Sequence, residues 1–116
     1  MAISFTKTNL SGSTNGRPIS VTSVAVTGAT IHTTASQTDE VWLWGMSTAT
    51  QSLRFVIEWG GTATGDTVNY DIPAAGAGPT LLVPGWLLTA SLVVRGYATQ
   101  ASIISVAGYV NRISVT

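Results

Sequence analysis

Apolar and polar residues alternate along this chain in short runs, which are separated by glycine, proline, asparagine, aspartate and serine. β-Branched and aromatic residues are frequent within the runs, and no long segment repeats its apolar residues at helical spacing. Such a pattern is typical of an all-β protein. The breaks between the runs predict about eight strands, over residues 17–27, 29–35, 39–47, 53–60, 66–73, 79–85, 89–99 and 101–115.

The number and spacing of these segments favour a single-domain β-sandwich of jelly-roll or Greek-key type, with a small closed barrel as the alternative. Residues 17–116 make up this predicted domain. Residues 1–16 are rich in serine, threonine, asparagine and glycine, and we expect them to form a polar N-terminal arm. If the arm clasps a partner, deleting residues 2–14 is expected to weaken binding and to leave the fold intact.

Three local features refine this prediction. The short polar connection between residues 39–47 and 53–60 indicates a hairpin. Pro84 and Gly85 predict a type II turn, because proline presets the first central position and glycine takes the positive φ of the second. Gly108 lies within a long apolar run and predicts a bulge or bend there.

The segment EVWLWGM, residues 40–46, is apolar on both of its faces. Alternation in a strand places its side chains in two groups, with Trp42, Trp44 and Met46 on one face and Val41 and Leu43 on the other. A small antiparallel domain normally exposes one polar face to water. A second covering layer is therefore expected over this strand: another chain, the N-terminal arm, or a long loop of the same chain.

The predicted hairpin allows two registers, and one of them places Trp44 opposite Arg54. Tryptophan and arginine in contact form a cation–π pair, and both residue types are frequent at interface hot spots. We therefore expect a subunit or shell interface that includes Trp42, Trp44, Met46, Arg54 and Trp86.

Charge is scarce in this chain, and that scarcity favours association. Charged residues make up 9% of the sequence, against about 25% in typical soluble proteins. The formal net charge is +0, with no basic stripe or acidic tail, so we expect neither a nucleic-acid partner nor a membrane surface. A neutral surface rich in threonine, serine, glycine and alanine has two explanations. The protein is a monomer with a polar, uncharged surface, or much of this surface is covered in an assembly.

The sequence also indicates the cellular compartment in which the protein is made. With Cys 0, the chain has no disulfide and no thiolate chemistry. Its first sixteen residues lack the charged start and apolar core of a secretory signal, and its most apolar stretch is interrupted by proline and glycine. We therefore expect a soluble product made in the cytoplasm.

Residue types that carry chemistry are few. His32 is the single histidine, no Gly-x-Ser-x-Gly elbow is present, and a histidine metal site normally needs several ligands. A strand histidine of this kind is expected to be structural. We predict no catalytic residues, no cofactor and no metal, although the count of carboxylates does not by itself exclude a glycosidase pair: Asp39, Glu40, Glu58, Asp66 and Asp71.

Two loops and the four tryptophans raise the question of calcium, phosphate or glycan binding. Asp66, Asn69 and Asp71 lie close in sequence, but they lack the spacing of a calcium loop, so turn and strand-edge roles are favoured, and Glu40 and Glu58 are expected to be strand-end charges. The glycines of EWGGTATGD are not followed by lysine or a helix that binds phosphate. Four tryptophans permit a glycan-binding module, provided that their faces are open to solvent beside free polar groups.

Seven segments span most of residues 16–113: GRPI (16–19), TIH (30–32), DEVWLW (39–44), IEWGG (57–61), LLVPG (81–85), LVVRGYA (92–98) and GYVNRI (108–113). Together they resemble a family of small tailed-bacteriophage virion proteins. This resemblance implies a non-enzymatic structural protein, namely a head decoration or cement protein that stabilises the assembled capsid.

The same resemblance implies a homotrimer that sits on the capsid surface and contacts the major capsid protein. It carries over no catalytic residue and no residue-level contact with the shell. A tail or baseplate adaptor is the alternative, since it shares the fold and composition, and the glycan-binding β-sandwich is the alternative outside virion structure.

Overall fold

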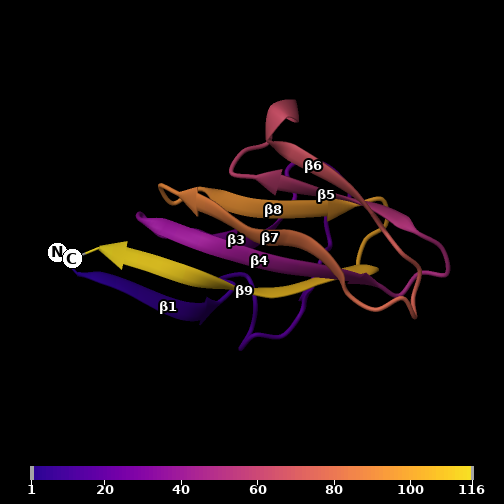
Figure 1. The fold of residues 1–116 in the computed structure, drawn as a ribbon. Helices are drawn as coiled ribbons and strands as arrows, with labels where there is room; N and C mark the ends of the chain where they lie inside the picture. The colour runs from indigo at the N-terminus through magenta and orange to yellow at the C-terminus, as the bar shows by residue number, and fades with distance from the viewer. Residues whose placement is uncertain (1, 116) are drawn as a thin grey trace.

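The computed structural model describes residues 2–115 as two antiparallel β-sheets packed face to face, which confirms the predicted β-sandwich (Figure 1). Sheet A has the order β1-β9-β4-β7, with β2 also paired to β9, and sheet B has the order β3-β8-β5-β6. A short 3₁₀ segment, η1, covers Thr64–Asp66. The strand bounds are β1 Ile3–Asn9, β2 Ile19–Ser20, β3 Ala29–Thr33, β4 Thr38–Ser47, β5 Leu53–Trp59, β6 Thr67–Ile72, β7 Thr80–Thr89, β8 Val93–Ala98 and β9 Ile104–Val115.

The strand pairing is nested. β5 pairs with β6, β4 with β7, β3 with β8, and β2 with β9, all antiparallel. The chain is therefore one long hairpin that is rolled up so that β4 also meets β9 and β5 also meets β8. This is the jelly-roll arrangement, and it decides among the predicted architectures.

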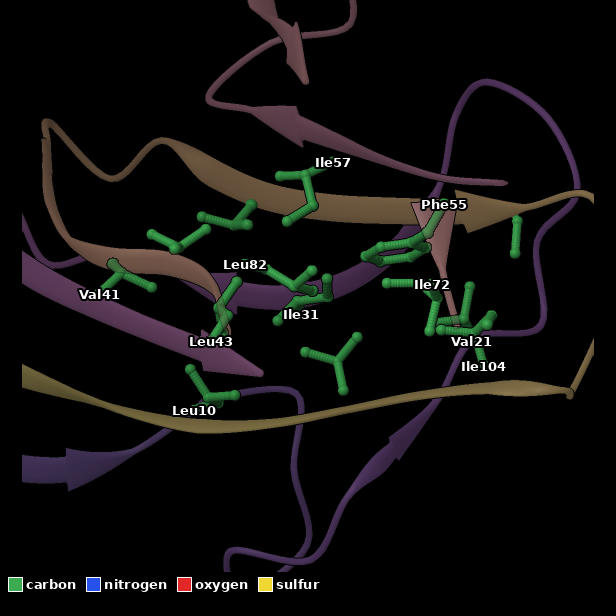
Figure 2. Close-up of a cluster of buried hydrophobic side chains, with 14 of the residues drawn as sticks. Leu10, Val21, Ile31, Val41, Leu43, Phe55, Ile57, Ile72, Leu82 and Ile104 are labelled. Atoms are coloured by element: carbon green, nitrogen blue, oxygen red, sulfur yellow. The ribbon is translucent and has the colours of Figure 1, made fainter. Parts of the chain in front are cut away.

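The predicted hairpin between residues 39–47 and 53–60 is wrong. β4 belongs to sheet A and β5 to sheet B, so the polar connection 48–52 arches from one layer to the other. Both strands carry an inward apolar row, and these rows pack across the sandwich instead of side by side. Leu43 and Phe55 lie in the same buried cluster (Figure 2).

That cluster fills the space between the sheets and draws on nearly every strand (Figure 2). Inward positions alternate with outward ones along β4, β8 and the first half of β9, as period-two patterning requires. Its buried members are Leu10, Val21, Ile31, Val41, Leu43, Leu53, Phe55, Ile57, Ile72, Leu82, Val83, Leu88, Val94, Ala98, Ile104, Val106 and Val110.

Two glycine predictions are corrected. Gly85 has the expected positive φ of 81°, but it lies at a register shift inside β7, opposite Val41 and Trp42, and not in a turn. Proline at residue 84 is tolerated there because β7 is an edge strand. Gly108 lies in an unbroken stretch of β9, where a Cβ atom would collide with the carbonyl oxygen of Trp42. Close approach of two backbones, and not a bulge, therefore requires this glycine.

The N-terminal arm is also corrected. Ile3–Asn9 forms β1, which pairs along its whole length with the C-terminal half of β9. The polar composition of residues 1–16 obscured the alternation of Ile3, Phe5 and Lys7 with serine and threonine. Leu10, which follows β1, is 2% exposed and belongs to the core, so the domain begins well before residue 17.

The length of an N-terminal truncation decides its effect. No side chain of β1 is buried, so deleting residues 2–8 is expected to cost less than about 1 kcal/mol of unfolding free energy. A deletion of residues 2–14 also removes Leu10 from the core, and it is expected to be clearly less stable. Urea unfolding of both truncated proteins checks this, and equal loss of stability in the two would contradict it.

Candidate functional site

One face of sheet A points away from the core and forms a broad surface, called here the outer face of sheet A. Cross-strand partners share a face, so the registers of β1, β9, β4 and β7 define its members. They are Ile3, Phe5, Lys7, Asn9, Thr38, Glu40, Trp42, Trp44, Met46, Leu81, Pro84, Leu87, Thr89, Ser105, Ala107, Tyr109, Asn111, Ile113 and Val115.

Three aromatic rings lie together at the centre of this face. The ring centroids of Trp42 and Trp44 are 6.1 Å apart, and each lies near Tyr109, at 6.4 Å and 6.2 Å. The three distances are almost equal, so the rings form a triangle, not a column. Their planes differ by 15° to 29°. Trp42 and Trp44 come from alternate positions of β4, and β9 supplies Tyr109 opposite Trp42.

The polar groups around this aromatic triangle are bonded to one another. Oε1 of Glu40 accepts hydrogen bonds from Trp42 Nε1 and Asn111 Nδ2, both at 2.8 Å. The bond from the indole, and then that from the amide, hold the pKa of Glu40 below its ordinary value. Nζ of Lys7 lies over the ring of Tyr109, 4.8 Å from its centroid. Within residues 2–115, both charged members of the outer face therefore have partners in the chain.

Large apolar side chains extend the surface beyond the triangle. Phe5 is 71% exposed and Leu87 58%, at opposite sides of the sheet. A shallow hollow of about 460 Å³ lies beside Trp44 and is lined also by Met46, Pro79 and Ala107. Exposed large apolar side chains gathered on one face of a sheet mark a site of interaction.

The structure brings together three of the five predicted interface residues. Trp42, Trp44 and Met46 share the outer face of sheet A, and no segment of residues 2–115 covers them as the core is covered. Arg54 lies elsewhere, on the outward side of sheet B, where it lines a separate hollow of about 200 Å³. It does not pair with Trp44, because β4 and β5 belong to different sheets.

Trp86 also lies apart from the aromatic triangle. Trp86 lies on β7, opposite Val41 of β4. Its ring meets the ring of Trp59 edge to face, with centroids 5.4 Å apart. Trp59 comes from sheet B and packs against the core. The two rings therefore close one side of the sandwich, and this contact is structural.

Sequence reasoning missed Tyr109, Lys7 and Asn111 as members of the surface. The alternation of residues 105–113 places Tyr109 and Asn111 on one side of β9, but nothing local says that this side adjoins the tryptophans. Lys7 was assigned to the arm. The β9 alternation is the one signal that could have found two of these residues.

His32 belongs to a buried polar network between the two sheets. Its Nε2 lies 2.7 Å from Oδ2 of Asp39, and its Nδ1 accepts a hydrogen bond from the backbone N–H of Ser11. A backbone N–H can only donate, so the ring proton sits on Nε2 and points at the carboxylate. Both ring nitrogens are thus occupied and the side chain is 1% exposed. Neither nitrogen is free to act as a general base, so this geometry provides a structural link.

Arg112 completes the network from β9. Its Nε donates to Oδ1 of Asp39 at 2.9 Å, and a terminal nitrogen donates to Oδ2 at 3.0 Å. Burial alone would raise the pKa of Asp39, but the hydrogen bonds from Arg112, His32 and the Ala35 backbone outweigh it and lower the pKa. The carboxylate therefore joins strands β3, β4 and β9 in its ionised form.

Glu58 is buried, which corrects its expected place as a strand-end charge. It lies on the outward side of β5, under the segment 22–28, and is 0% exposed. Its Oε1 accepts a 2.6 Å hydrogen bond from the backbone N–H of Gly28, and its Oε2 has no hydrogen-bond partner among the described residues. The predicted strand 17–27 is mostly not a strand. Only β2 forms within it, and its later residues cross over the outward side of sheet B.

Substitution of Gly28 is expected to loosen this crossing. A Cβ atom there would lie 2.5 Å from the carbonyl oxygen of Gly96 and 2.7 Å from Oε1 of Glu58. Gly28→Ala is therefore expected to lower the unfolding free energy by about 1 to 2 kcal/mol in urea titrations. The matched variant Gly65→Ala meets nothing within 4 Å and is expected to be neutral. Equal effects of the two would contradict this contact.

The remaining chemical readings find no support in the geometry. Asp66 lies in η1, and Asn69 and Asp71 are exposed on β6. Residues 2–115 contain no group of three or more His, Cys, Asp or Glu side chains placed to hold a metal ion. The same part of the chain includes no helix with the length and apolarity needed to span a membrane.

Comparisons with known proteins gave no match to a family model, to a curated protein or to a solved structure.

Proposed function

We propose that this protein is a non-enzymatic structural component of a tailed-bacteriophage virion, a decoration or cement protein that binds the assembled head. The observation that carries the proposal is the outer face of sheet A, which holds Trp42, Trp44 and Tyr109 at its centre and exposed Phe5 and Leu87 toward its two edges. A surface of this kind gains free energy when a protein covers it, because apolar area leaves water.

The bonding within that face favours a protein partner. Glu40 already accepts from Trp42 and Asn111, so covering these three groups breaks fewer hydrogen bonds with water than covering them unpaired would. Lys7 is likewise held over Tyr109. The desolvation cost that normally opposes burial of polar groups is therefore reduced.

The assignment to a phage virion rests on seven segments that resemble small phage virion proteins. DEVWLW (39–44) and LVVRGYA (92–98) are two of these segments. The partners in this proposal are the major capsid protein and copies of the same chain in a homotrimer, on the capsid surface, after synthesis in the host cytoplasm. As a fold-level analogy only, jelly rolls occur in viral capsid proteins and in lectins.

The mechanism of such a protein is mass action. A chain that binds the assembled shell and not its free subunits shifts the equilibrium toward the shell. Many copies bound to one particle add to this effect. Contact between neighbouring copies also slows the dissociation of each copy from the shell.

Cryo-electron microscopy of virions that carry this chain tests the proposal most directly. Density for the jelly roll on the outside of the head, with the outer face of sheet A covered, is the expected result. Density on the tail or baseplate would instead identify an adaptor. Purified protein is also expected to sediment with empty heads and not with unassembled capsid protein.

A glycan-binding module is the second candidate, and the aromatic triangle is the observation that favours it. Aromatic rings on an open sheet face offer stacking surfaces for sugars. The Asn111 amide already donates to Oε1 of Glu40, which weakens this candidate. A monomeric protein that binds immobilised oligosaccharides, with quenching of tryptophan fluorescence, would replace the virion proposal.

A further inference from the structure

We infer that β1 pairs edge to edge with β1 of a second copy of this chain, antiparallel and about a two-fold axis beside Phe5. β1 is the outermost strand of sheet A and lies beside β9 near both chain ends (Figure 1). One side of the strand is paired from Ile3 to Asn9. The other side presents backbone N–H and C=O groups that a further strand can bond.

The other sheet edges carry features that discourage such pairing. β7 contains Pro84 and two register shifts, β3 contains one shift, and β2 has two residues. β6 carries the charge of Asp71 and stops before Pro73. Prolines, irregularities, short strands and charges are the devices by which edges avoid self-association. β1 has seven residues in regular register, and its one charge, Lys7, is held over Tyr109.

A second copy of β1 fits this edge because the strand is self-complementary. With the axis beside Phe5, each Phe5 lies opposite Phe5 of the other copy, and each Ile3 lies opposite Lys7. The pairing covers the two most exposed apolar side chains of β1, Phe5 at 71% and Ile3 at 57%. It sets no like charges opposite each other, and it stays clear of Asn9, beside which Gly16 lies.

The contact has a geometric consequence for the outer face of sheet A. Cross-strand partners point to the same side of a sheet, so the outer faces of the two copies become one continuous surface. The pairing uses the sheet edge and leaves the aromatic triangle uncovered. It therefore stands independently of the capsid proposal and requires only the purified chain in solution.

Cysteine trapping tests the pairing, because the natural chain has Cys 0 and any introduced thiol reports alone. Ser4 lies opposite Thr6 of the other copy, at a Cα separation of about 5 Å, within the range of a disulfide. Two Ser4 residues are about 7 to 8 Å apart, which is too far. A mixture of the full-length Ser4→Cys and Thr6→Cys proteins is therefore expected to yield at least roughly fivefold more disulfide-linked dimer than either protein alone.

Two controls complete the test. Ser4→Cys mixed with Thr64→Cys, an exposed position in η1, is expected to give only background crosslinking. In sedimentation velocity, Phe5→Lys sets lysine opposite lysine and is expected to weaken the dimer roughly tenfold, whereas Phe5→Tyr keeps it. The inference is overturned if the Ser4 and Thr6 mixture crosslinks no better than the single variants, or if Phe5→Lys and Phe5→Tyr dimerise equally. Neither result bears on head binding.

Discussion

Asp39→Asn is expected to lower the unfolding free energy by about 3 kcal/mol. The carboxylate is fully buried and accepts from Arg112 on both oxygens and from His32 on one. An amide accepts at only one of its two ends, so at least one of these donors would face an NH₂ group. The guanidinium of Arg112 is partly exposed and can turn to water, which keeps the loss below that of a fully enclosed pair.

The pH dependence of stability provides a second readout of the same site. The native pKa of Asp39 lies below its unfolded value, so the unfolded chain binds the proton more readily. The contribution of Asp39 is therefore complete above the unfolded pKa of about 3.9, and it is lost as the pH falls through the lower native pKa. Asp39→Asn is expected to flatten this acid limb of the stability curve.

Urea titrations across the acid range measure both effects. Asp71→Asn is the matched control, because Asp71 is exposed on β6 and its replacement is expected to change stability by less than about 0.5 kcal/mol. An Asp39→Asn protein as stable as the Asp71→Asn control would show that the network contributes nothing net. An unchanged acid limb would show that other carboxylates govern acid unfolding.

Local patterning predicted the strands well and their partners poorly. The alternation within residues 39–47 and 53–60 matches β4 and β5 closely, because side-chain period is a property of a single strand. Which strand lies beside which depends on contacts far apart in the sequence. Asp39 and Arg112 are neighbours across β4 and β9, and the sequence around either residue does not predict this contact.

The errors at the N-terminus and at Glu58 have a common physical cause. Composition favoured a free arm for residues 1–16, although β1 needs no buried side chain to pair with β9. Composition also favoured exposure for Glu58, which is buried because segment 22–28 crosses sheet B above it. In both cases backbone hydrogen bonds determine the structure, and a hydrophobicity pattern does not report them.

The shared face of three predicted interface residues was predictable because it depends on a single strand. Trp42, Trp44 and Met46 share a face by alternation alone, and the structure places that face outside the core. Arg54 was added through an assumed strand pairing, and Trp86 on the frequency of its residue type at interfaces. Neither of these two lies with the aromatic triangle.

Trp42→Ala and Trp44→Ala are each expected to weaken homotrimer formation and head binding at least roughly 30-fold, equivalent to about 2 kcal/mol, and to leave the pairing of β1 strands intact. Both rings lie at the centre of the outer face of sheet A, and each touches the other and Tyr109. Residues central to a buried surface dominate binding energy, because the surrounding contacts exclude water from them. Sedimentation of the purified variants, alone and with empty heads, measures both affinities.

Tyr97→Ala is the matched control, since Tyr97 is a partly exposed aromatic residue on the outward side of sheet B. It is expected to leave both affinities within about twofold of the natural protein, because that face is not the proposed contact. Urea unfolding of all three variants separates loss of binding from loss of fold. Equal weakening by Tyr97→Ala would place the contact on both sheets, and full binding by the two tryptophan variants would remove the outer face of sheet A from the assembly surface.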